Sequence, residues 1–117
     1  MIKHILVTAG PTREKIDPVR YISNYSTGTF GYEIASAARK RGLCVTLVSG
    51  PTLLTAPKGV RLVRVESADD MRTAVLKFLT WSDCVIMTAA VADWRPRYSA
   101  RRKMKKGGAR NIELVEN

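Results

Sequence analysis

The stretch Thr8–Tyr32, TAGPTREKIDPVRYISNYSTGTFGY, decides the fold of this chain. It continues the apolar run His4–Thr8, which is rich in β-branched residues and is ended by AGP at positions 9–11. Such a run is typical of a buried strand in a parallel sheet. His4, the only histidine, is interpreted as a surface or hydrogen-bonded residue rather than a catalytic base, because it stands alone at a strand start.

The middle and the end of this stretch predict a loop followed by a helix. Thr12–Ser23 contains turn formers and charges, which favour a loop or a short helical turn. A helix is expected from Thr27 or Gly28 to Arg41, ended by Gly42. Apolar residues at three- and four-residue spacing predict its buried face: Phe30, Ile34, Ala37 and Ala38.

Beyond this stretch, strands alternate with one further helix. Leu43–Ser49, Val60–Val65 and Asp83–Thr88 are short apolar runs that predict three more strands. Ala68–Leu79 has helical periodicity, and Ser67 with an acid three residues later predicts a capping box at its start. The expected buried face of this helix consists of Met71, Val75, Phe78 and Leu79.

Strands that alternate with helices and are apolar on both faces predict an α/β fold, a Rossmann-like open parallel sheet flanked by helices. At 117 residues the chain can bury one core, so we expect a single compact domain or a piece of a slightly larger one. Ligands of such sheets bind beyond the carboxyl ends of the strands. This rule places one set of loop residues along a single edge: Gly10, Asn24–Gly31, Gly50 and Ala89–Asp93.

Composition excludes several other classes of protein. No apolar run approaches the roughly 18 residues of a membrane-crossing helix, and Met1 leads directly into the first strand, so we expect a soluble, cytoplasmic protein. Cys44 and Cys84 lie inside apolar runs. They are interpreted as small buried hydrophobic residues rather than a disulfide or a metal-binding pair.

The net charge of +10 is concentrated near the end of the chain. Residues 1–94 carry 12 basic and 8 acidic side chains, whereas Arg95–Arg110 holds eight basic residues and no acid. This tract, called the basic arm below, is typical of a solvated, mobile loop. From charge alone, a solvated loop, a surface for an anionic ligand and a nucleic-acid surface all stay open.

The loop that opens the first helix suits a phosphate. In NYSTGTFG (24–31), backbone N–H groups, the hydroxyls of Ser26 and Thr27 and the helix dipole converge, and Gly28 and Gly31 allow close approach. Structural turns produce Gly-x-x-Gly equally often, so a purely structural loop stays open. A dinucleotide site is disfavoured, because G-x-G-x-x-G is missing after the first strand and an acid is missing after the second.

A second motif, TAAVADWRP (88–96), follows the last expected strand. Its alanines allow a flat or extended ligand to approach closely, and a single carboxylate, Asp93, lies beside Trp94 and Arg95. A tight bend capped by Asp93 explains the same residues without a ligand. The motif alone leaves both interpretations open.

Taken together, these segments resemble phosphopantothenoylcysteine synthetase. AGPTREKIDPVRYISNYSTG, LVSGPT, AAVADWRP, KMKK and ELVEN match that family in order and spacing. The resemblance implies a ligase of coenzyme A biosynthesis that joins 4'-phosphopantothenate to L-cysteine through an acyl-cytidylate. It also implies CTP as the nucleotide, with ATP as the other candidate, together with Mg²⁺, a homodimer and, in bacteria, fusion to a phosphopantothenoylcysteine decarboxylase.

The resemblance implies roles for individual residues as well. The expected catalytic residues are Asn24, which would bind the acyl intermediate, and Lys103. The basic arm, residues 95–110, would form a flexible flap from which Lys103 neutralises the triphosphate. Arg20 would reach the substrate phosphate from the second subunit of a dimer. The nucleotide would be held by Gly10, Ser26, Thr27, Gly28, Gly31, Ala89 and Asp93, and the phosphopantothenate by Arg20, Asn24, Ala89, Ala90 and Asp93. No metal-ligating side chain is assigned.

The chain departs from the family pattern at four positions and in length. It has Thr27, Phe30 and Met104 where the family more often has Ser, Met and Ile, and Trp94 where Tyr or Phe is usual. Each replacement keeps the hydroxyl or the apolar character of its position. The family's synthetase domain is about twice as long, so residues 1–117 are interpreted as the N-terminal part of a single synthetase domain.

Two other functions stay open on the residues alone. The basic arm would also suit a module that binds nucleic acid or another polyanion. A Rossmann-like fragment that binds a nucleotide without catalysis would need the same loops. No motif assigns a role to Arg97, Arg101, Arg102 or Arg110.

Overall fold

The computed structural model describes all 117 residues and is centred on an open, four-stranded parallel sheet. Its strands are β1 (His4–Ala9), β4 (Cys44–Ser49), β5 (Arg61–Arg64) and β6 (Cys84–Met87). They lie in the order β5-β4-β1-β6, and every neighbouring pair is parallel. The predicted α/β fold with a Rossmann-like parallel sheet is confirmed.

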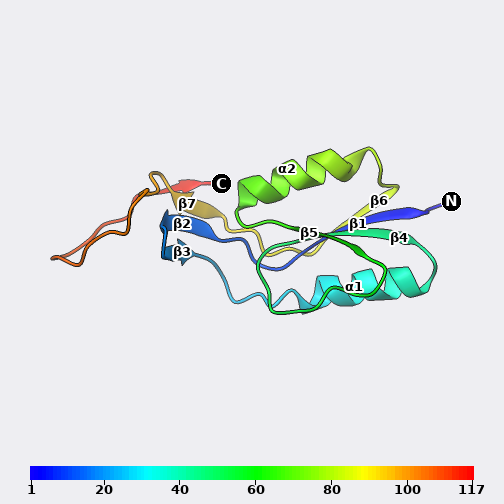
Figure 1. Cartoon of the computed structure of the whole chain (residues 1–117). Coiled ribbons are helices and arrows are strands. Elements are labelled where there is room, and N and C mark those ends of the chain that lie inside the picture. Colours follow the sequence, from blue (N-terminus) through cyan, green and yellow to red (C-terminus); the bar gives the residue numbers. More distant parts are fainter.

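Two helices cover opposite faces of this sheet: α1 (Thr29–Lys40) and α2 (Ala68–Leu79) (Figure 1). Because successive side chains of a strand point to opposite faces, β1 serves both helices. Val7 and its alternate neighbours pack in the cluster under α1, whereas Leu6 packs in the cluster under α2. β1 is therefore buried on both sides, as its continuous apolar run predicts.

The buried face of α1 consists of small residues and Tyr32. The predicted face is right for Ala38, which is buried, and for Ile34, which packs against the core, but wrong for Phe30 and Ala37. Tyr32, Ala35 and Ala38 are buried, but Phe30 is 72% exposed and Ala37 is also exposed. A Cβ at Gly31 would overlap the side chains of Ala9 and Thr88, so the helix lies too close to β1 for any larger residue there. The helix faces the sheet with its small residues and turns Phe30 outward.

The ends of both helices follow the predicted signals. The capping box at the start of α2 is present, and Gly42 after α1 has a φ of +84°, the left-handed conformation that favours glycine. Met71 and Ala74 form the buried face of α2. Leu79, which was expected in that face, is exposed because it lies in the last turn, beyond the edge of the cluster.

The segment Thr12–Ser23, expected to be a loop or a helical turn, forms a β-hairpin instead. Strands β2 (Glu14–Asp17) and β3 (Arg20–Ile22) pair antiparallel, with an irregular register between Lys15 and Asp17. The prediction failed because the residues that the hairpin buries are carboxylates, Glu14 and Asp17, rather than apolar side chains.

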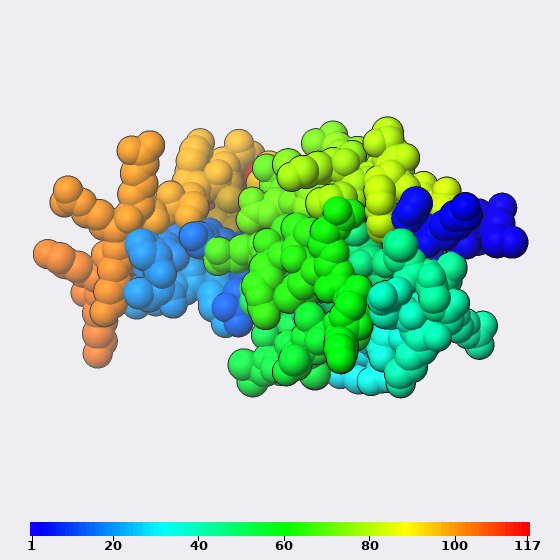
Figure 2. All heavy atoms as spheres, turned by 45° about the vertical axis from the view of Figure 1, so that its right-hand side comes forward, coloured from blue at the N-terminus to red at the C-terminus, as the bar shows by residue number.

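A second antiparallel pair lies next to this hairpin. It consists of β7 (Trp94–Pro96) and β8 (Leu114–Glu116), and the basic arm runs between them apart from its first residues, which belong to β7. Figures 1 and 2 show the arm standing away from the body, which gives the molecule its long axis of 58 Å against 26 and 19 Å.

The cysteines are less buried than expected. Cys44 is exposed and Cys84 is partly exposed, because each is the first residue of its strand at the amino edge of the sheet. Neither forms a disulfide. His4 lies at the same edge, half-exposed, with its ring 4.6 Å from Trp81 and Nδ1 3.7 Å from Asp83 Oδ2, as expected for a surface residue with a partner. Neither helix has the length and apolar character that crossing a membrane requires.

Candidate active site at the carboxyl edge of the sheet

Three of the predicted segments meet at the backbone of Ala90. Its N–H donates to the Gly10 carbonyl at 2.9 Å, and its carbonyl accepts from the Thr12 N–H at 3.2 Å. The same carbonyl accepts Nδ2 of Asn24 at 2.8 Å. The loop after β1, the loop after β6 and the loop before α1 are thus joined at one point, as the rule for parallel sheets predicts.

The loops pack so closely that glycine is required between them. Gly28 has a φ of +82°, and a Cβ on it would come within 3.2 Å of the Gly10 Cα. Both glycines lie in the left-handed region, where other residues are strained by roughly 1–3 kcal/mol. Gly10 and Gly28 are therefore brought together, and each has a structural reason to be glycine in addition to any contact with a ligand.

The start of α1 leaves backbone donors without a protein acceptor. No side chain caps this helix, and its first turn holds no acid. The N–H groups of Phe30 and Gly31 donate to no acceptor in the chain, while those of Gly28 and Thr29 donate to hydroxyls at 3.3 and 3.4 Å, which is long for a hydrogen bond. Free amides and the positive end of the helix dipole make this point attractive to an anion.

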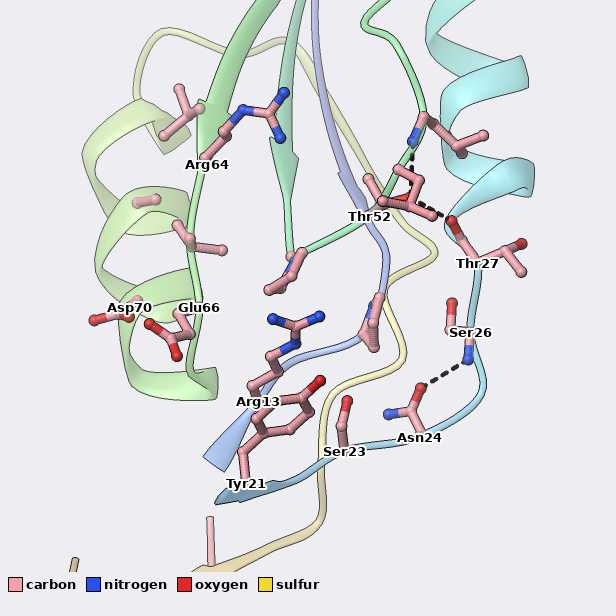
Figure 3. Close-up of a pocket in the computed structure, with 18 of the residues that line it drawn as sticks. Arg13, Tyr21, Ser23, Asn24, Ser26, Thr27, Thr52, Arg64, Glu66 and Asp70 are labelled. Carbon is pink, nitrogen blue, oxygen red and sulfur yellow. Dashed lines mark hydrogen bonds between the residues drawn. The ribbon is translucent and has the colours of Figure 1, made fainter. Parts of the chain in front are cut away.

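A cleft of 1510 Å³ opens beside the start of α1 and extends to α2 (Figure 3). Asn24, Ser26 and Thr27 line it from the α1 side, and Glu66 and Asp70 line it from the α2 side. The loop next to it is fixed by Thr52, whose hydroxyl donates to the Thr27 carbonyl at 2.7 Å. The remaining residues predicted for the site do not line this cleft: Gly10, Arg20, Gly28, Gly31, Ala89, Ala90, Asp93 and Lys103.

Cationic side chains of the cleft were missed by sequence reasoning. Arg13, Arg64 and Lys77 all line it, and Arg13 lies 4.4 Å above the Tyr21 ring. Arg13 lies in the segment that follows the first strand, after Gly10, Pro11 and Thr12, so its position beside the ligand edge was a usable signal. Arg64 and Lys77 carried no such signal, because their place depends on how β5 and α2 pack.

Asp93 is exposed, and its carboxylate accepts no hydrogen bond, so it does not cap the bend after β6. The bend is held instead by Thr12, whose Oγ1 accepts the Ala92 N–H at 2.9 Å. Ala89 also lies at this edge, with its N–H 3.4 Å from the Thr8 hydroxyl. The carboxylate of Asp93 is thus left available at the edge.

Arg20 projects from the turn of the β2–β3 hairpin, where its guanidinium pairs with Asp17. The Asp17 side chain is fully buried. Burial alone would raise the pKa of its carboxyl, but the amides of Met104, Val19 and Arg20 and the Arg20 guanidinium lower the pKa from 3.8 to about 2. The lowered pKa of Asp17 stabilises the folded protein above pH 3.8, and this contribution is lost as the pH falls towards 2 and the carboxylate becomes protonated.

Lys103 is exposed on the basic arm and forms no ion pair. The residue after it, Met104, is attached to the hairpin because its N–H donates to Asp17 Oδ2 at 3.1 Å. Arg20 and Lys103 are therefore neighbours through Asp17, while both lie apart from the cleft that Asn24 lines.

Comparisons with known proteins identify the family of this chain. The family described as DNA/pantothenate metabolism flavoprotein C-terminal domain matches residues 1–117. The chain belongs to this family. As a member of it, the chain is 53% identical over 114 residues to the coenzyme A biosynthesis bifunctional protein CoaBC of Bacillus subtilis (strain 168). That alignment covers 96% of the chain and 28% of the relative, so the chain spans less than a third of it.

Solved structures of the family's domain have the same fold. The C-terminal domain of a coenzyme A biosynthesis bifunctional protein CoaBC superposes with a TM-score of 0.86 at 51% identity, covering 98% of this chain and 54% of that one. A mutant of Cab2, solved in complex with phosphopantothenate-cysteine, superposes with a TM-score of 0.78 at 16% identity, covering 98% and 57%. At that identity the second likeness shows the shared fold alone. The motif-based resemblance to the synthetase is confirmed at the level of the family.

Proposed function

We propose that residues 1–117 form the phosphate- and acyl-binding part of a ligase that joins 4'-phosphopantothenate to L-cysteine with CTP. The observation that carries the proposal is the junction at Ala90, where Asn24, the loop after β1 and the loop after β6 meet. Relatives named for coenzyme A biosynthesis, about 50% identical over the same residues, support the pathway.

The reaction would proceed in two steps. A carboxylate is a poor electrophile, so the pantothenate carboxylate first attacks the α-phosphorus of CTP, giving acyl-cytidylate and pyrophosphate. The amine of cysteine then attacks the acyl carbon, expels CMP, gives up a proton and forms the amide. Negative charge develops on phosphate oxygens in the first step and on the acyl oxygen in the second, so fixed donors are the main catalytic resource.

The start of α1 would bind the phosphates. Its two unpartnered amides, at Phe30 and Gly31, and the long contacts at Gly28 and Thr29 give donors that a phosphate oxygen can take without breaking a strong bond. Ser26 and Thr27 add hydroxyls at the same point and line the cleft.

Asn24 would hold the acyl oxygen. Its Oδ1 accepts the Ser26 N–H at 3.1 Å and its Nδ2 donates to the Ala90 carbonyl at 2.8 Å, so the carboxamide is fixed at both ends. An amide nitrogen carries two hydrogens, and Ala90 uses only one of them. The second is free to donate to the acyl oxygen of the intermediate, which would stabilise the charge that develops there during attack by cysteine.

Mg²⁺ would enter with the nucleotide. The chain has no group of three or more His, Cys, Asp or Glu side chains that could hold a metal ion. This fits a magnesium ion that takes most of its ligands from phosphates and water, as is usual in nucleotide sites. Near the Ala89 edge, Asp93 is a free carboxylate that would supply at most one ligand.

The remaining parts of the proposal concern other polypeptide segments. We infer that Arg20 serves the substrate phosphate of a second subunit, because it lies on the hairpin and not in the cleft beside Asn24. Lys103 would approach the triphosphate from the arm. Relatives named as bifunctional support fusion to a decarboxylase.

The decisive test separates the two steps in the native full-length protein. With phosphopantothenate, CTP and Mg²⁺, Asn24→Ala should still release pyrophosphate but should lose roughly a hundredfold or more in CMP release on adding cysteine, which is typical of removing one such donor. Acyl-cytidylate should accumulate and be visible by mass spectrometry. Parallel assays with ATP would establish the nucleotide.

The matched control is Asn111→Ala. Asn111 is an exposed asparagine directly after the basic arm, and its side chain makes no hydrogen bond. It should behave as wild type in both steps. Rapid CMP release by Asn24→Ala would remove the role of Asn24, and no pyrophosphate release by the wild type with either nucleotide would remove the ligase proposal.

A second candidate function rests on the exposed arm. Arg101, Arg102, Lys103, Lys105 and Lys106 are charged, and none of them forms an ion pair. Binding to nucleic acid through such a tract would weaken steeply with salt. No binding to single- or double-stranded nucleic acid at low salt would exclude this candidate.

A further inference from the structure

Asp17 is the most densely hydrogen-bonded side chain of the molecule. Its Oδ1 accepts the N–H groups of Val19 at 2.9 Å and Arg20 at 2.8 Å. Its Oδ2 accepts the Met104 N–H at 3.1 Å and pairs with the Arg20 guanidinium. A buried charge with this many donors is satisfied on both oxygens, and each donor would be left unpaired if the carboxylate were removed.

The same carboxylate provides the shorter of two hydrogen-bonded attachments of the outer arm, residues 101–112, and both are made to Met104. The first hydrogen bond between the arm and the hairpin is donated by the Ala100 N–H to the Ile16 carbonyl at 2.9 Å. Between residues 101 and 112, Met104 alone bonds to the rest of the chain, through Asp17 and, at 3.5 Å, through Arg20. The Arg110 bond to the Lys105 carbonyl stays inside the arm.

We infer that Asp17 is a positioning residue that couples the two phosphate-directed cations, holding the Arg20 guanidinium and the Lys103–Met104 segment as one unit. What Arg20 and Lys103 bind rests on the proposed function, whereas the tether itself rests on the contacts of Asp17. One carboxylate then sets the place of a cation meant for the substrate phosphate and of another meant for the triphosphate.

The coupling would strengthen phosphate binding, which a carboxylate with a purely structural role would not do. An arm carrying Lys103 without a tether would sample many positions, and the ordering entropy would weaken every phosphate contact that it makes. With Met104 fixed at Asp17, the arm is already ordered next to Arg20. The low pKa of Asp17, about 2, means that the tether stays charged throughout the range in which the protein would work.

The direct test is Asp17→Asn in the native full-length protein. The remaining oxygen of Asn can still accept the Val19 and Arg20 amides, but the new NH₂ group faces the Met104 N–H and the guanidinium, which are donors themselves. Arg20 and the arm should both be released. We expect KM to rise roughly tenfold for both CTP and phosphopantothenate, with a smaller change in kcat, because the loss is in ground-state positioning.

A second readout does not depend on the proposed function. Trypsin cuts after Lys103 only if the Lys103–Met104 bond leaves the hairpin, since the N–H of Met104 is bound by Asp17. In Asp17→Asn, cleavage at this bond should speed up roughly tenfold, because one charged hydrogen bond is lost. Cleavage after Arg110, on the same arm but without an attachment to the body, provides the internal reference and should not change.

Asp83→Asn is the matched control variant. Asp83 also accepts two backbone N–H groups, from Lys3 at 2.8 Å and His4 at 2.9 Å, and these bonds hold the pKa of its carboxyl below its usual value. It lies at the amino edge of the sheet, away from the arm and the site. Its loss should affect stability but neither KM nor the cleavage after Lys103.

The outcomes are separable. Unchanged cleavage after Lys103 in Asp17→Asn would overturn the tether. Faster cleavage with unchanged KM for both substrates would overturn the coupling to ligand binding. If the wild-type protein has no ligase activity, the proposed function fails, and faster cleavage in Asp17→Asn would still establish the tether of the arm.

Discussion

The two helices of this protein begin in opposite ways. At the start of α2, Ser67 Oγ accepts the Asp70 N–H at 3.0 Å, and Asp70 Oδ2 accepts the Ser67 N–H at 3.1 Å. A second carboxylate, from the buried Glu14 of the hairpin, accepts the Ala68 N–H at 3.0 Å. Acidic residues also fill the first turn. The positive end of this helix is therefore neutralised by the chain itself.

The start of α1 has none of these groups. Its N-cap is Gly28, no side chain caps it, no acid lies in its first turn, and the amides of Phe30 and Gly31 have no acceptor. Both helices begin at the carboxyl edge of the parallel sheet, but the open helix is the one whose start lies beside the loops that are joined at Ala90. Acidic side chains neutralise the start of α2 and are absent from the start of α1, whose positive end is thus left for the anion that we propose binds there.

The largest effect should come from moving the open end of α1. In Gly31→Ala, the new methyl group would overlap the side chains of Ala9 and Thr88, so α1 would have to shift away from β1. We expect the free energy of unfolding to fall by about 1–3 kcal/mol, as for other overpacked cores. Urea denaturation measures this fall, and CTP should lose affinity in parallel.

Gly107→Ala is the control for the glycine substitution, because a Cβ at Gly107 meets no atom within 4 Å and its φ is not positive. It should leave stability unchanged within about 0.5 kcal/mol. Equal stability of the Gly31→Ala and Gly107→Ala variants would mean that α1 is not pressed against β1 as described.

The second effect should come from giving α1 an acid like those of α2. Phe30 is 72% exposed in the first turn, so Phe30→Glu changes charge with little change in packing. The acid should stabilise the ligand-free protein by about 0.3–1 kcal/mol through the helix dipole. It should weaken CTP binding roughly tenfold by repelling the phosphates, which calorimetric titration would measure.

Phe30→Gln separates charge from shape. It has nearly the size of Glu and no charge, so it should bind CTP as the wild type does. If Gln and Glu weaken binding equally, the open helix start is not an electrostatic phosphate site, and the contrast between the two helices loses its functional meaning.

Sequence patterns predicted what is decided locally. The box at Ser67 needs only a residue and its neighbour three positions on, and Gly42 needs only its own φ, so both were found. The four apolar strands were found because each packs apolar residues against the cores on both faces of the sheet, although β5 and β6 are only partly buried. The loops after β1 and β6 and before α1 were also predicted to meet at one edge of the sheet, although the hydrogen bond between Asn24 and Ala90, 66 positions apart, could not be predicted from spacing.

The failures have a common physical cause, which is polar groups buried by partners distant in sequence. Glu14 receives its donor from α2, 54 positions away, and Asp17 receives one from Met104, 87 positions away, in addition to its local donors Val19 and Arg20. Because charged residues are normally assigned to the protein surface, the sequence predicted a loop where the β2–β3 hairpin lies. The face of α1 was misjudged for a related reason, since how closely β1 approaches Gly31 is a tertiary property.

The smallest effects should come from single hydroxyls, and they should divide between the two helices. Ser67→Ala removes a cap at 3.0 Å and should cost about 1 kcal/mol of stability without altering CTP affinity. Ser26→Ala removes only a long contact, 3.3 Å to the Gly28 N–H, so it should cost less stability while weakening CTP binding. Thermal unfolding with and without CTP measures both quantities on each variant. If Ser67→Ala lowers affinity, or Ser26→Ala lowers stability by as much as Ser67→Ala, then the two helix starts do not divide their roles, and the open end of α1 has to be explained by packing alone.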